Sequence, residues 1–429
     1  MKMNMKNFKV NPTNAIMYTF ALVGPLSTTF LDSYNLIFCV VLFLFLFFLI
    51  SVNKKKIHIN KTNKIFIFSY LSFSLIALFS TLISLPDITS ENHLTNLLSR
   101  LSTISLTLII LICISVWIHN QEVRKLLNFL KFAFFSTIIF AAIAIYQILA
   151  YHYNLPFIET RSYIYGTSYE IQQSLGIRIT SLAREPNFYA PILIESFLLS
   201  FLFLKRSALC IYVIFSIFLI YKTHSTGAYI HFTLISILLF IFLGRNKLTK
   251  LITTIILLIS LFFLIYYLTL YDNYFTNKLL NEINGESSRT LIYSTIIYEI
   301  FNSNFLHLLF GHGVNTLQLF NELATENYNI NFSVSNSLYI DILWDSGLIG
   351  LICFSFGFFL LFLSLKRSAR NNKYGTIALF LFLNLLITSI YRSEYTTTHF
   401  SWISSIIFVC YQLANPRDKN EAKHAIRNT

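Results

Sequence analysis

Residues 126–150 read LLNFLKFAFFSTIIFAAIAIYQILA, 25 residues that carry one charge, Lys131. A helix of this length crosses the hydrocarbon core of a bilayer, which takes roughly 17 to 25 predominantly apolar residues. Arg124 and Lys125 come directly before the stretch. Basic residues of this kind flank membrane-spanning helices on the cytoplasmic side. The stretch therefore predicts a transmembrane helix that begins in the cytoplasm.

Apolar runs of similar length recur along the whole chain. Hydrophobic residues make up 55% of the sequence and charged residues 12%, whereas a soluble domain carries roughly twice that share of charge. The pattern predicts an all-α polytopic membrane protein, one domain over residues 1–429, with about twelve transmembrane helices. We place them at 15–31, 34–52, 65–85, 101–118, 126–150, 188–204, 207–221, 226–243, 250–270, 346–365, 375–391 and 398–414.

The charges alternate between the two sides of this arrangement. Loops on the side of the N-terminus, with their flanking helix ends, hold 24 of the 32 Lys and Arg. The other side holds the remaining 8 together with 15 of the 19 acidic residues. Basic loops stay in the cytoplasm, so both termini are predicted to be cytoplasmic. The net charge of +13 is thus a signal of topology and of contact with the bilayer, and gives no case for nucleic acid.

Two connections are long, 151–187 and 271–345, and both are predicted to be extracytoplasmic. The second has apolar residues at 291, 292, 296, 297, 300 and 301. This spacing predicts a short amphipathic helix that lies on the outer surface. Function is expected in these loops, since the other connections are short.

Positive charge on the outer side runs against the insertion bias and needs a compensating partner. Arg178 and Arg184 come just before a predicted helix that opens with Pro186 and Asn187, and Arg289 lies in the second loop. Arginine forks match phosphate oxygens, and helix N-termini favour anions. We therefore expect these three arginines to bind an anion, whereas Arg161 is expected to pair with an acidic residue.

Three other polar residues, Glu195, Arg392 and Glu394, each have more than one interpretation. Glu195 falls near the middle of a predicted helix, where a carboxylate is either functional, protonated or paired with a neighbouring helix. Arg392 and Glu394 either pair with each other or line the path of a sugar. The 44 phenylalanines are expected to face lipid.

Four stretches carry a resemblance to a known family. They are Arg178 to Asn187; Ser225 to Ala228; Ser288-Arg289 with Phe310-Gly311-His312-Gly313; and Ser335-Asn336 through Gly347-Leu-Ile-Gly350. In their order and spacing the chain resembles the O-antigen polymerase (Wzy-type) and O-antigen ligase superfamily of bacterial polysaccharide membrane proteins. The resemblance spans most of the chain.

The resemblance implies a metal-independent membrane glycosyltransferase without a cofactor, located in the bacterial inner membrane. Its donor would be a glycan on undecaprenyl diphosphate, its site would face the periplasm, and a chain-length regulator protein is a further partner. The family's diphosphate-binding arginines correspond to Arg178 and Arg289, with Arg184 as an addition. Asn187, Asn336 and Arg392 are candidates for binding the glycan.

One departure from the family pattern bears on the reaction. Ligases of this superfamily carry a histidine where this chain has Asn336. The expected function is therefore polymerisation of lipid-linked repeat units, with His312 or Glu185 as the general base. The alternatives are a ligase that transfers the glycan to lipid A core, and a lipid-linked-oligosaccharide flippase. A flippase needs polar groups near the midplane, and few intramembrane charges occur here.

Overall fold

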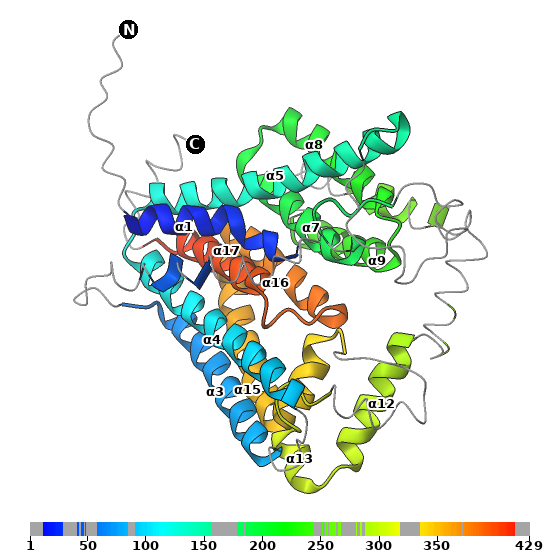
Figure 1. Ribbon diagram of the computed structural model, residues 1–429. Coiled ribbons are helices and arrows are strands. Elements are labelled where there is room, and N and C mark those ends of the chain that lie inside the picture. Colours follow the sequence, from blue (N-terminus) through cyan, green and yellow to red (C-terminus); the bar gives the residue numbers. More distant parts are fainter. Residues whose placement is uncertain are drawn as a thin grey trace.

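A computed structural model of the chain describes thirteen helical segments (Figure 1). They are α1 (Pro12–Val23), η1 (Gly24–Thr28), α3 (Lys61–Ser84), α4 (Glu91–His119), α5 (Val123–Tyr153), α7 (Pro186–Phe203), α8 (Arg206–Lys222), α9 (Thr226–Leu243), α12 (Ser288–Asn302), α13 (Phe305–Phe310), α15 (Leu338–Ser368), α16 (Lys373–Tyr391) and α17 (Thr398–Ala414). The residues described are 12–28, 58–84, 91–156, 178–183, 185–243, 288–317, 335–370 and 372–416, with isolated positions within 41–48 and 251–284.

The protein is an all-α polytopic membrane protein, as the sequence predicts. Within the described residues, six helices are long and apolar enough to cross a membrane, namely Lys61–Ser84, Leu97–His119, Val123–Tyr153, Pro186–Phe203, Leu338–Ser368 and Lys373–Tyr391. Thr226–Phe242 is a shorter apolar helix. The predicted spans at 34–52 and 250–270 lie largely outside the described residues. The full number of twelve therefore stays a prediction.

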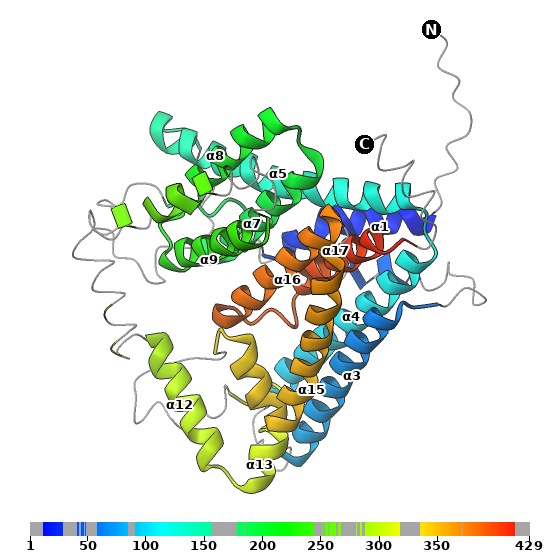
Figure 2. The same ribbon diagram turned by 180° about the vertical axis from the view of Figure 1, so that it is seen from behind.

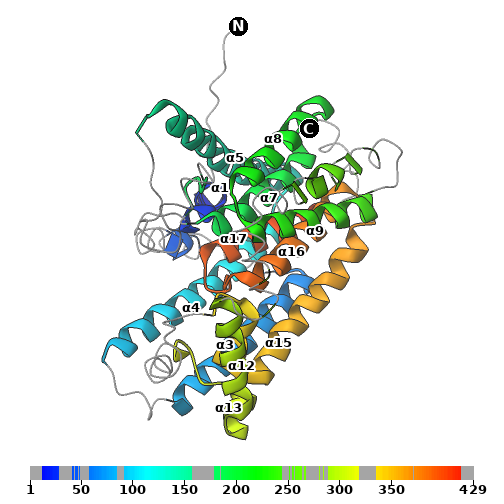
Figure 3. The same cartoon turned by 90° about the vertical axis from the view of Figure 1, so that its right-hand side faces the viewer.

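The helices form two groups with a shared centre (Figure 1). One group contains α1, α5, α7, α8 and α9, and the other contains α3, α4, α12, α13 and α15 (Figure 2). In the second group α15 packs along α3 (Figure 3). Helices α16 and α17 pack against each other and contact both groups. Helices α16 and α17 therefore join the two helix groups at the centre of the protein.

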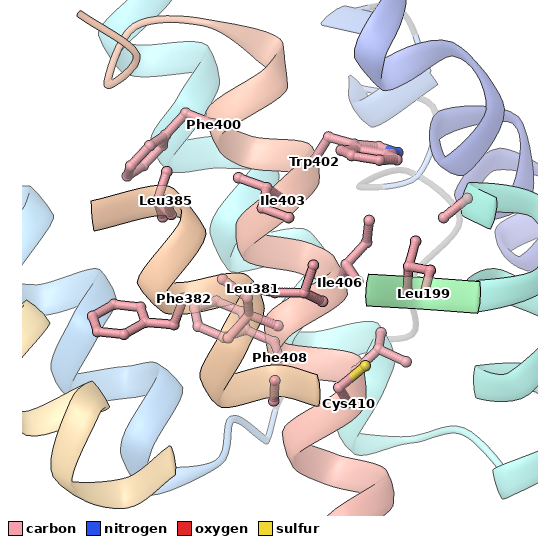
Figure 4. Close-up of a cluster of buried hydrophobic side chains, with 14 of the residues drawn as sticks. Leu199, Leu381, Phe382, Leu385, Phe400, Trp402, Ile403, Ile406, Phe408 and Cys410 are labelled. Carbon is pink, nitrogen blue, oxygen red and sulfur yellow. The ribbon is translucent and has the colours of Figure 1, made fainter. Parts of the chain in front are cut away.

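Helix α17 is buried along nearly its whole length (Figure 4). Leu199, Leu381, Phe382 and Ile406 belong to the buried cluster around it. An apolar helix that is buried on all sides belongs to the core of a large bundle. The expectation that phenylalanine faces lipid was therefore wrong for many positions, because rings such as Phe66, which stacks on Phe358, fill the interior between helices.

The second long loop contains the helix that its periodicity predicts, since α12 covers Ser288–Asn302. Ile292, Ile296 and Ile300 are buried on one face, whereas Leu291 and Ile297 are exposed. The buried face packs against α15. Helix α15 begins at Leu338, within the range assigned to the loop, and has a kink at Gly347, whose φ of 64° is left-handed.

Helix ends that charge assigns to the same side of the membrane meet in the structure. On the side predicted to be cytoplasmic, the Thr62 hydroxyl lies 3.1 Å from the Tyr411 hydroxyl. On the opposite side, Arg100 Nη2 donates a hydrogen bond of 3.2 Å to the Tyr395 hydroxyl. The pairing agrees with the predicted alternation of loops, and which end faces the cytoplasm stays a prediction.

Candidate functional site

The segment before α7 lies against the turn between α8 and α9. Arg178 donates from Nε to the Thr223 carbonyl at 3.3 Å, which fixes one edge of its guanidinium. The Ser225 hydroxyl donates to the Asn187 side-chain oxygen at 2.6 Å. Two of the four stretches that carry the family resemblance are thereby joined at one end of the bundle.

This end of the bundle is electropositive. Burial lowers the pKa of His224 to about 4, and the charges of Lys222 and Arg178 act in the same direction. The imidazole is therefore neutral at neutral pH, because burial disfavours its charged form and the two neighbouring cations add to this effect. A bound anion would be favoured here, because its charge is opposite to those of Lys222 and Arg178.

The start of α7 is held by an arginine from the connection between α16 and α17. Glu185 is the N-cap of α7 in extended conformation, and Pro186 occupies the first turn, where a missing N–H costs nothing. The guanidinium carbon of Arg392 lies 3.9 Å from the centre of the Phe188 ring. Its Nη1 donates to the Phe188 carbonyl at 3.4 Å. The charge of Glu185 also acts on Arg392.

A buried chain of polar groups runs inward from Arg392. Arg392 forms an ion pair with Glu394. His399 lies between two carboxylates, with Nδ1 2.7 Å from Glu394 Oε2 and Nε2 3.0 Å from Glu195 Oε2. Asn384 donates to the second oxygen of Glu195 at 3.1 Å. The interpretation in which Glu195 and Glu394 pair with neighbouring groups is the one observed.

The geometry of His399 implies a bound proton. An ionised carboxylate only accepts hydrogen bonds, and a neutral imidazole has a single N–H to donate. Both ring nitrogens of His399 face carboxylate oxygens within hydrogen-bond distance. Either the imidazole is protonated or one carboxylate is. Burial raises the pKa of Glu394, but the charges of Arg392 and His399 and hydrogen bonds from His399 and Thr397 lower it to about 2. Glu394 is therefore ionised at neutral pH, and the bound proton lies on the imidazole or on Glu195.

Tyr395 lies on the other side of the same connection and belongs to a second network. Its hydroxyl donates to Asp345 Oδ2 and accepts from Arg100 Nη2. Its backbone carbonyl accepts a 2.8 Å hydrogen bond from the Tyr70 hydroxyl. Residues 392–399 thus contact the α7 side through Arg392 and the α4–α15 side through Tyr395.

The turn that leads into α15 is bound to that second network. Ser335 donates from its backbone N–H and from its hydroxyl to Asp341 Oδ1, at 3.0 and 2.5 Å. Asn336 has a left-handed φ of 61° and an exposed side chain. Asparagine tolerates this conformation better than most residues. Its amide is therefore at the surface, one residue after Ser335, which binds the buried Asp341 carboxylate.

His312 is packed between two other rings. His307 and Trp344 stack on either face of it, with ring centres 4.5 and 4.3 Å away. The His312 backbone N–H donates to the Trp344 carbonyl at 2.7 Å. Burial, followed by the charge of His307, lowers the pKa of His312 to about 4. Its Nε2 is buried and has no hydrogen-bond partner among the described residues.

The predicted site residues fall into two groups. Four lie around the start of α7, namely Arg178, Glu185, Asn187 and Arg392. Two, His312 and Asn336, lie beside the start of α15. Arg184 lies outside the described residues, and Arg289 lies in the first turn of α12 with its side chain outside them. The part of the chain that is described has no group of three or more His, Cys, Asp or Glu arranged to hold a metal ion.

The sequence analysis did not single out three residues that the structure places in these networks. They are Arg100, Tyr395 and His399. Arg100 had a usable signal, because it is one of the few basic residues on the outer side. His399 had none, since a lone histidine at the start of an apolar run is common at membrane interfaces.

Residues 211–355 match the family model described as O-antigen ligase. The matched part, about a third of the chain, is therefore similar to the O-antigen ligase/polymerase superfamily. It covers three of the four resembling stretches, and the Arg178–Asn187 stretch precedes it. Neither the curated proteins nor the solved structures gave a match. Members of that family are membrane enzymes of the glycosyltransferase type.

Proposed function

We propose that the protein polymerises oligosaccharide repeat units carried on undecaprenyl diphosphate, at the periplasmic face of the bacterial inner membrane. The product would be O-antigen or a related surface polysaccharide. The observation that supports this most is the electropositive end of the bundle, where Arg178 lies beside the Asn187–Ser225 hydrogen bond. A diphosphate suits that environment, and its lipid tail extends into the bilayer.

In the proposed reaction, a sugar hydroxyl of the incoming unit attacks the anomeric carbon of the growing chain. Undecaprenyl diphosphate is the leaving group, and negative charge develops on it. Arg178, Arg184 and Arg289 stabilise this charge by donating hydrogen bonds to the diphosphate. Asn187 and Asn336 contact the glycan, whereas Arg392, the third candidate from the sequence, is buried and paired with Glu394. His312 and Glu185 are the base candidates from the sequence, and no metal ion or cofactor takes part.

The family match is equally consistent with a ligase, which transfers the finished glycan to lipid A core. Asn336 favours the polymerase, because it occupies the position where the resembling ligases carry histidine. An amide cannot accept a proton at neutral pH, so this position lacks a base.

Deletion of the gene, followed by gel display of the surface glycan, separates these functions. A polymerase predicts loss of the ladder with one repeat unit retained on the lipid A core. A ligase predicts loss of all glycan from the core, as does a flippase. Accumulation of polymer on undecaprenyl diphosphate would identify the ligase, and complementation with the intact gene is the control.

A further inference from the structure

Asp341 has an unusual hydrogen-bond arrangement in the first turn of α15. One oxygen, Oδ1, accepts two hydrogen bonds from Ser335, which orient the carboxylate. The other oxygen, Oδ2, has no hydrogen-bond partner among the described residues, although the residue is only 5% exposed. Buried carboxylate oxygens in folded proteins are normally satisfied, and an exception requires an explanation.

The surroundings of Oδ2 place a positive charge near the carboxylate without occupying this oxygen. Arg100 Nη2 lies 3.9 Å away, beyond hydrogen-bond distance but close enough to stabilise the negative charge. The position in the first turn of a helix acts in the same direction. Arg100 is held by the Tyr395 hydroxyl and is 22% exposed, so the group nearest to Oδ2 is itself partly open to the outside.

Of the two base candidates from the sequence, His312 has less suitable surroundings. His312 is stacked on both faces, and the lowered pKa of its imidazole makes it a weak base. Glu185 caps α7 next to the charge of Arg392. Asp341 lies five residues after Asn336, the position from which a basic side chain is missing.

We propose that Asp341 is the general base of the glycosyl transfer, with Oδ2 as the atom that accepts the proton. The proposal rests on the function proposed above. The acceptor hydroxyl transfers its proton to Oδ2 while its oxygen forms a bond to the anomeric carbon. The bond from that carbon to the diphosphate oxygen breaks, and its electron pair leaves with the diphosphate. Asp341 then releases the proton to water. Arg100 and Ser335 are positioning residues.

The test compares Asp341→Asn with Glu185→Gln and His312→Gln in membranes that contain the full chain. Asparagine keeps the shape and both contacts to Ser335 but cannot take up the proton. We expect Asp341→Asn to lower polymer formation by at least about 100-fold, as loss of a general base does. It should bind undecaprenyl diphosphate, the leaving group, as tightly as the unchanged protein. Glu299→Gln on α12 removes another carboxylate of the outer side and is the matched control.

Arg100→Lys gives a second measurement that does not depend on the folding of Asp341→Asn. Among the described residues, the charged and titratable groups near Asp341 are Arg100 from α4, Tyr395 and, on its own helix, Asp345. Lysine keeps a positive charge but loses the planar fork that donates to the Tyr395 hydroxyl, so polymer formation should fall while binding of undecaprenyl diphosphate is unchanged.

The outcomes separate the assignment of the base from the proposed function. A normal ladder from Asp341→Asn or from Arg100→Lys contradicts the assignment of the base. A complete loss in Glu185→Gln or His312→Gln with activity left in Asp341→Asn transfers the role to that residue. Failure of the unchanged protein to bind undecaprenyl diphosphate contradicts the proposed function instead.

Discussion

The Glu195 carboxylate, inside α7, lies 3.0 Å from Nε2 of His399 at the start of α17. The two residues are 204 positions apart in the chain, and both are almost fully buried. Their contact joins the helix group that contains Arg178 to the central pair α16–α17. Since the same imidazole also binds Glu394, it connects the core of the bundle to the connection that carries Arg392 and Tyr395.

Replacement of His399 should therefore destabilise the protein. His399→Ala leaves two buried carboxylates without their shared partner, and loss of one member of a buried ion pair costs about 3–5 kcal/mol. We expect a clear drop in the unfolding temperature of the purified protein in detergent, with a smaller drop for His399→Gln. His152→Ala, at an exposed position near the end of α5, is the control. Equal unfolding temperatures for all variants would mean that the hydrogen bonds of His399 to Glu195 and Glu394 do not stabilise the fold.

The kink at Gly347 should tolerate no side chain. A Cβ there would lie 2.3 Å from the Leu309 carbonyl oxygen and 2.5 Å from the Gly311 nitrogen, at a left-handed φ of 64°. Strained backbone of this kind costs roughly 1–3 kcal/mol before the clash is counted. We expect Gly347→Ala to lower the yield of folded protein and its unfolding temperature.

Gly227→Ala is the matched control, because its Cβ would have no atom nearer than Ser225 Oγ at 4.0 Å. Alanine in a helix is roughly 0.5–1 kcal/mol more favourable than glycine, so this variant should be as stable as the parent or more so. If the two variants behave alike, the close approach of α15 to the 309–311 turn is not what requires Gly347.

Local patterns account for what could be predicted from the sequence. The length of apolar runs gives the spanning helices, and a period of 3.6 gives α12. Contacts between distant segments follow no local pattern, so the partner of Glu195 stayed open. The kink at Gly347 could not be predicted for the same reason. The group that leaves no room for a side chain there, the Leu309 carbonyl, belongs to another helix. That Glu185 lies at the start of α7 and His312 beside the start of α15 also depends on tertiary packing.

The pH dependence of stability should report on His312. Its pKa in the folded protein is lowered to about 4 from an ordinary value of 6.5, because burial disfavours the charged form. The stabilisation is therefore complete above pH 6.5 and is lost as the pH falls from 6.5 toward 4. His312→Gln should flatten the fall of the unfolding temperature across this window. A slope that is the same in both proteins would show that another group titrates there.

Cysteine labelling tests the orientation that the charges predict. Lys61 begins α3 at the predicted cytoplasmic end, and Tyr153 ends α5 at the outer end with 71% exposure. The background lacks the native cysteines Cys39, Cys113, Cys210, Cys353 and Cys410. In cells with only the outer membrane permeabilised, an impermeant reagent should label Tyr153→Cys and not Lys61→Cys. The reverse pattern would invert the topology and move both networks to the cytoplasmic side.

The arginines of the proposed diphosphate site should not be replaceable by lysine. Lysine keeps the charge but loses the planar fork that binds two phosphate oxygens at once. Each charge-assisted hydrogen bond contributes roughly 1.5–3 kcal/mol, which corresponds to about a ten- to 150-fold change in rate. Arg178→Lys and Arg289→Lys should therefore shorten or abolish the glycan ladder at normal membrane abundance. Arg178→Lys also loses the bond to Thr223, so abundance has to be measured for it in particular.

Arg161→Ala is the control for this comparison, because Arg161 belongs to the same outer loop as Arg178 but is expected to pair with an acidic residue. It should give a normal ladder. A defect in Arg161→Ala as large as in the lysine variants would mean that these loops respond to any loss of charge. Normal ladders from both lysine variants would exclude bidentate recognition of the diphosphate. A defect confined to Arg289→Lys would leave Arg178 with the structural role that its bond to the Thr223 carbonyl already gives it.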